Sequence, residues 1–154
     1  MGRAILGVIV GYIVMAGVVI GSFAAAWMVF GQDSAYKEGL WEISTTWMIM
    51  MFVAGLIAAM IGGAVCAAIA AKGSKAAMVL AGLVLVLGFV DAGFKLAAPR
   101  EDRPTVREDN VTMFEATQSS QEPTVMLLGN PVIGLVGVLI GARLVGRKRA
   151  AAVG

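Results

Sequence analysis

The residues from Trp47 to Ala71 form an uncharged apolar stretch, and this stretch most constrains what the chain can fold into. A helix of about 25 residues is roughly 37 Å long, whereas the hydrocarbon layer of a membrane is ~30 Å thick. The stretch is therefore long enough to cross a membrane with some tilt. It predicts a transmembrane helix around which the remaining segments are to be placed.

The composition agrees with a membrane protein and excludes common kinds of active site. Of the 154 residues, 59% are hydrophobic and 14% are charged, whereas soluble domains carry about 25% charged residues. There is no histidine, and Cys66 is the single cysteine. The commonest general base, the commonest zinc and haem ligand and an internal disulfide are thus all missing. We expect no catalytic residue, no metal site and no cofactor, and we expect that the protein is not an enzyme.

Three further apolar stretches predict a bundle of four transmembrane helices. The first stretch is about twice as long as a signal-peptide core, so we predict that it is retained. The fold class is then all-α: a polytopic four-helix membrane bundle that forms a single domain, residues 1–154. The predicted helices span residues 4–31, 47–71, 76–96 and 125–146; the loops are 32–46 and 97–124, the turn is 72–75 and the basic tail is 147–154.

Short motifs predict where some helices begin and end. Gly73 suits the position after a helix end, and Ser74 suits the cap of the next helix. A connection of four residues makes the second and third helices antiparallel neighbours. Ser44, Thr45 or Thr46 can cap the second helix. In the long polar loop, Asp109 or Asn110 can cap a short helix over 114–118, and the rest of that loop is predicted to be extended or mobile.

Small residues recur at four-residue intervals in several of the helices. This spacing places them on one helix face, where they let a second backbone approach closely, and close approach drives helix association in lipid. We expect such faces to pack against another helix of this chain, of a second copy or of a larger complex. The row of the second helix is Gly55, Ala59, Gly63, Ala67 and Ala71; the fourth helix has Gly137 and Gly141; the first has Gly7 and Gly11, followed by Gly17, Gly21 and Ala25.

The charges predict an orientation. Four spans place both termini on one side, and that side carries seven cations and no acid: Arg3, Lys72, Lys75, Arg143, Arg147, Lys148 and Arg149. All ten acidic residues fall on the other side or, for Asp91, at its edge. Because Lys and Arg in short flanks favour the cytoplasm, we predict cytoplasmic termini in a bacterial inner membrane. Trp27, Trp41 and Trp47 map to the outer interface, which is typical of an aromatic belt.

Three polar residues within or beside the helices are candidates for contacts. Asp91 can form an interfacial ion pair with Lys95 four residues later, contact a partner, or serve ion transport. Asn130 precedes Pro131, so it can mark a helix start or a kink inside a longer helix, or it can face a ligand.

The sequence therefore supports three kinds of function. The first is a small membrane protein without catalytic motifs, which serves as a helix-packing accessory or structural subunit or as a homo-oligomer. The second is a small oligomeric transporter or channel. The third is an outer-face binding or sensing module built from loop 97–124. The expected partners are the lipid bilayer and either a second copy or a larger membrane complex, but not nucleic acid.

Overall fold

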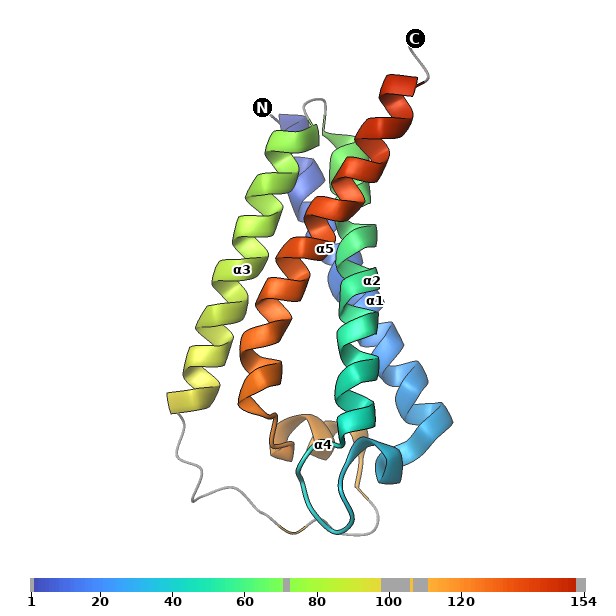
Figure 1. The fold of residues 1–154 in the computed structure, drawn as a ribbon, viewed down its shortest axis with the longest axis vertical. Helices are drawn as coiled ribbons and strands as arrows, with labels where there is room; N and C mark the ends of the chain where they lie inside the picture. Colours follow the sequence, from blue (N-terminus) through green and yellow to red (C-terminus); the bar gives the residue numbers. More distant parts are fainter. Residues whose placement is uncertain (1, 71–72, 98–105, 107–110, 152–154) are drawn as a thin grey trace.

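The computed structural model is all-helical, as predicted, and describes residues 2–70, 73–97, 106 and 111–151 (Figure 1). Four of its helices are long and apolar enough to cross a membrane. A fifth, short helix lies in the long polar loop. In chain order the helices are α1 (Gly2–Ala35), α2 (Thr45–Ile69), α3 (Gly73–Ala97), α4 (Met113–Ser119) and α5 (Thr124–Ala151).

The four long helices form one bundle with both chain ends at the same end (Figure 1). α2 contacts α1 and α5, and α5 also contacts α3. Although α2 and α3 are joined by a short connection, each makes its larger contact with α5 rather than with the other. The short connection therefore keeps α2 and α3 together at one end, while along the bundle both helices pack more against α5 than against each other.

The connection between α2 and α3 differs from its predicted form. α2 ends at Ile69, and α3 already begins at Gly73, which is thus helical rather than the residue that follows α2. Residues 71–72 and the side chain of Ser74 lie outside the described part of the chain, so the predicted cap by Ser74 has no structural counterpart here.

α1 ends at Ala35, four residues beyond its predicted end, but its backbone is kinked at Gly31. Gly31 has φ 68° and ψ −178°, a backbone conformation that is essentially confined to glycine. The following residues, 32–35, form a last helical turn that leads into the first polar loop. Gly31 thus ends the straight part of the first apolar helix where the sequence predicted the helix to end.

The first polar loop and the described residues 111–123 of the long polar loop pack on each other and form a cap over the end of the bundle opposite the termini (Figure 1). The hydroxyl of Tyr36 donates to the carbonyl of Ala116 at 3.1 Å, and this bond is buried. The amide of Gln121 donates to the carbonyl of Trp41 at 2.9 Å. These bonds connect segments about 80 residues apart, so residues 111–123 of the long loop are held against the first loop.

Aromatic side chains fill the space between this cap and the helices. The Trp47 ring lies edge-on to the rings of Phe23 and Trp27, with centroids 5.8 and 6.3 Å away. Tyr36 and Trp41 pack edge-on at 5.4 Å. The three tryptophans lie at the predicted end of the bundle, where Trp41 and Trp47 are buried. Both pack against other aromatic rings of the chain.

The caps of α2 and α4 show how local polar groups set the helix starts. Ser44 caps α2 and accepts a hydrogen bond from the amide of Trp47 at 3.1 Å. α4 is capped by Thr112 rather than by Asp109 or Asn110, which lie outside the described residues. The amide of Glu115 donates to the Thr112 hydroxyl oxygen at 3.3 Å, and the Glu115 carboxylate accepts from the amide of Thr112 at 2.8 Å, which completes a reciprocal capping box. The same carboxylate also accepts from the Thr112 hydroxyl. The two bonds that it accepts lower the pKa of the Glu115 carboxyl.

The fourth apolar helix contains its proline rather than starting at it. α5 begins at Thr124, seven residues before Pro131. Of the two predicted roles, the structure thus has Pro131 inside a longer helix. Gly88 of α3 makes room for the proline ring, because a Cβ atom there would lie 2.7 Å from the Cγ of Pro131. A small residue on α3 therefore accommodates the bulk that proline adds to α5.

Candidate functional site

The most distinctive feature of the bundle is the backbone contact between α2 and α5. A Cβ atom added to Gly63 would overlap the carbonyl oxygen of Val138, and one added to Gly141 would overlap the carbonyl oxygen of Met60. A Cβ on Gly137 would lie 2.6 Å from that of Ala59. The two helices therefore approach so closely that only glycine fits at these positions.

A second face of α2 makes a similar contact with α1. A Cβ on Gly62 would lie 2.7 Å from the carbonyl oxygen of Gly11, and a Cβ on Gly11 would lie 2.8 Å from that of Gly62. A Cβ on Gly7 would lie 2.9 Å from the carbonyl oxygen of Cys66. Because Gly62 and Gly63 are adjacent and point to different sides, α2 is packed between α1 and α5 through consecutive residues.

The structure divides the predicted row on α2. Ala59, Gly63 and Ala67 are buried, whereas a Cβ on Gly55 would meet nothing within 4 Å, so Gly55 is off the contact. Ala71 lies outside the described residues. The sequence row also omits Leu56, whose carbonyl oxygen would lie 2.9 Å from a Cβ on Gly137. The residues of α2 that make close contacts thus form a shorter row than the predicted one. Their contacts are with α1 and α5 of the same chain.

Asp91 and Lys95 form an ion pair in the part of α3 nearest the loops that cover the bundle, and a third charge joins them. The ammonium of Lys95 lies 3.2 Å from Oδ2 of Asp91 and 2.9 Å from Oε1 of Glu122. Glu122 immediately precedes Pro123 and the start of α5. The charge cluster of Asp91, Lys95 and Glu122 therefore connects the end of α3 to the chain that enters α5.

The ion pairs of this charge cluster contribute little energy because their side chains are partly exposed to solvent. The Lys95 side chain is 39% exposed, and ion pairs at exposed positions contribute about 0–1 kcal/mol. Sequence reasoning did not find Glu122, because it lies 27 residues from Lys95 across a polar loop. No local spacing rule relates the two positions.

We expect Lys95→Gln to lower the free energy of unfolding by no more than about 1 kcal/mol. The loss should shrink when the salt concentration is raised, because salt screens exposed charges. Chemical unfolding in one detergent at low and high salt measures both effects, with Lys37→Gln, whose pair with Glu42 is local, as the control. A larger, salt-independent loss would mean that the cluster is not an ordinary interfacial ion pair.

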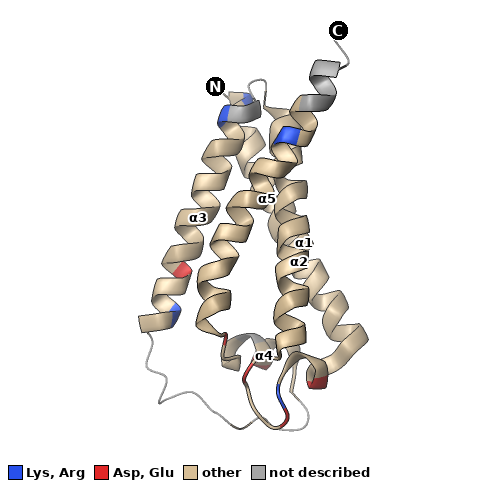
Figure 2. Ribbon diagram, viewed as in Figure 1, with Lys and Arg blue, Asp and Glu red and all other residues tan. Residues whose placement is uncertain are grey.

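The remaining candidate residues lie apart from this cluster. Asn130 is exposed on α5. Arg3, Lys75 and Arg143 are exposed at the end of the bundle that bears the termini (Figure 2). Lys72 lies outside the described residues, as do the side chains of Arg147, Lys148 and Arg149.

Within the described ranges, no three His, Cys, Asp or Glu residues are grouped so that they could hold a metal ion. Comparison with protein-family models, with curated proteins and with solved structures finds no match for this chain.

Proposed function

We propose that this chain is a non-catalytic integral membrane protein, an accessory or structural subunit that associates with a second transmembrane helix. That helix belongs to another copy or to a larger membrane complex. The proposed site is the bacterial inner membrane, with both termini in the cytoplasm and the cap outside.

The observation that carries this proposal is the exposure of α1. Only 11% of the most apolar 18-residue stretch of α1 is buried, compared with 39% of the corresponding stretch of α5. Gly7 and Gly11 are covered by α2, whereas a Cβ on Gly17 or Gly21 would meet nothing within 4 Å. The same helix thus packs closely at one end and leaves a face with the same small-residue spacing uncovered. In lipid, such a face favours association with another helix.

The charge distribution supports the orientation. The described cations of the termini end are Arg3, Lys75 and Arg143, and no described acid lies there (Figure 2). The described acids lie at the capped end or, for Asp91, in the half of α3 nearest to it (Figure 2). This is the asymmetry that places basic flanks in the cytoplasm.

The transporter alternative has less support. No charged, amide, serine or threonine side chain is buried among the described residues, and the contacts of α2 with α1 and α5 close the space between those helices. A polar path would therefore have to run between copies of the chain.

Replacement of Gly21 tests the proposed association. We expect the protein extracted in a mild detergent to migrate as a complex in native mass measurements, either as a homo-oligomer or with a stoichiometric partner. Gly21→Leu should dissociate that complex without lowering the melting temperature. Gly55→Leu is the matched control, because it adds the same side chain to an equally open position on α2. A monomeric wild-type chain, or equal behaviour of the two variants, would contradict the proposal.

A further inference from the structure

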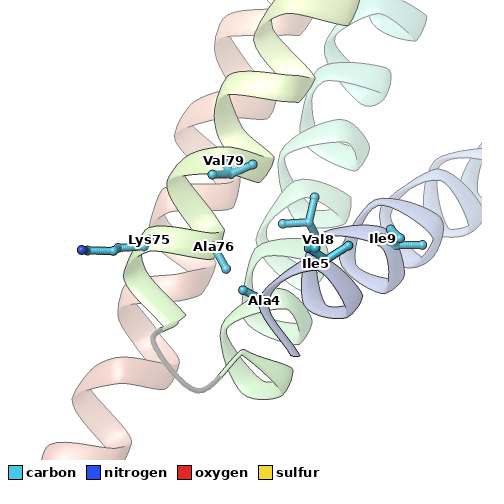
Figure 3. A pocket seen from close by; sticks show the side chains of 7 residues that line it. All are labelled: Ala4, Ile5, Val8, Ile9, Lys75, Ala76 and Val79. Carbon is cyan, nitrogen blue, oxygen red and sulfur yellow. The ribbon is translucent and has the colours of Figure 1, made fainter. Parts of the chain in front are cut away.

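A pocket of about 310 Å³ lies between α1 and α3 near the end that bears the termini. Its walls are apolar: α1 contributes four residues between Ala4 and Ile9, and α3 contributes Ala76 and Val79 (Figure 3). Lys75 lies beside the pocket on α3, and its ammonium points away from α1 and from the pocket (Figure 3). The pocket interior is thus apolar, and the nearest described cation lies outside it on α3.

The walls restrict what this pocket can hold. Small-molecule sites orient a polar ligand with several converging polar groups. Here the lining side chains other than Lys75 are all aliphatic, so a polar ligand would lose its hydrogen bonds to water without replacement. A hydrocarbon chain has no such requirement. It fits a pocket whose walls include the exposed side chains of Ile5, Ile9 and Val79.

The charges at the opening select among lipids. Lys75 is exposed beside the pocket, and Arg3, which directly precedes the wall residue Ala4, is exposed as well. Among the described residues no carboxylate lies at this end of the bundle (Figure 2). A cation near the membrane surface attracts an anionic headgroup, whereas a zwitterionic headgroup gains little.

We propose that this pocket binds an anionic phospholipid, with one acyl chain between α1 and α3 and the phosphate beside Lys75. The inference rests on the proposed membrane placement but not on the association through α1. A chain that fails to associate can still bind lipid, so the two proposals fail independently.

Lipid binding to the detergent-solubilised protein, resolved by native mass spectrometry, tests this site. Phosphatidylglycerol and phosphatidylcholine with identical acyl chains are the two probes. We expect Lys75→Gln to weaken phosphatidylglycerol binding about fivefold and to leave phosphatidylcholine binding unchanged. Arg143→Gln removes a cation from the same end but outside the pocket, so it should change neither.

A second pair of variants tests the acyl-chain position. Val79→Phe fills the pocket and should weaken the binding of both lipids, whereas Val86→Phe should not. The two valines are matched, since both lie on α3 and are 60% and 61% exposed, so both variants should fold. Equal binding by Val79→Phe and Val86→Phe, or by Lys75→Gln and Arg143→Gln, would overturn the proposal.

Discussion

Gly63→Leu is expected to destabilise the bundle by about 3 kcal/mol or more, at the upper end of what overpacking costs. Even a Cβ atom at Gly63 overlaps the backbone of Val138, and a backbone cannot move aside by changing a rotamer. The leucine must therefore push α5 away from α2 and reduce the dispersion contacts along several turns. Thermal unfolding of the purified variant in one detergent measures the loss.

Gly55→Leu is the control that makes this result interpretable. Gly55 lies on the same helix, belongs to the same sequence row and has open space around it. Leucine raises helix propensity equally at both positions. If the two variants lose stability equally, then the close contact between α2 and α5 does not hold the bundle together.

Trp47→Ala should cost about 3–5 kcal/mol, the range for removing a large buried aromatic side chain. Trp47 is 3% exposed and contacts the rings of both Phe23 and Trp27. Because these rings lie under the cap, we also expect the two polar loops to loosen. Limited proteolysis should cut the variant at Lys37 faster than the wild-type protein.

Phe114→Ala is the corresponding control at the same end of the molecule. Phe114 is 72% exposed, so its removal should change the free energy of unfolding by no more than about 0.5 kcal/mol. Similar losses in Trp47→Ala and Phe114→Ala would mean that the aromatic cluster does not hold the cap.

The helical class and the four long apolar segments could be predicted from sequence because they depend on long uninterrupted runs of apolar residues. The length of an uncharged run is a local property, as is the spacing of Asp91 and Lys95. The end of the apolar part of α1 was also readable, since Gly31 closes the uncharged stretch. Such features need no knowledge of which helices touch.

The features that could not be predicted depend on long-range packing. A four-residue spacing of small residues does not tell which of them meets a partner. The predicted row on α2 therefore contains Gly55, which is off the contact, and leaves out Leu56, which is part of it. The same spacing does not name the partner, which for Gly63 is α5. The burial of Trp41 and the contribution of Glu122 both result from loops that fold back on the bundle across many residues. Sequence periodicity carries no information on such contacts.

Cysteine labelling of intact cells tests most directly whether this bundle spans a membrane with its termini in the cytoplasm. Cys66 is the single cysteine and is buried, so Cys66→Ala gives a background without thiols that keeps the Cβ atom. Phe114→Cys then places a thiol on the cap, and Gly146→Cys places one in open space near the end of α5. A membrane-impermeant maleimide should label Phe114→Cys on intact cells, and Gly146→Cys only after the membrane is permeabilised. Labelling of Gly146→Cys but not Phe114→Cys on intact cells would contradict the orientation, and equal labelling of both would contradict the membrane span.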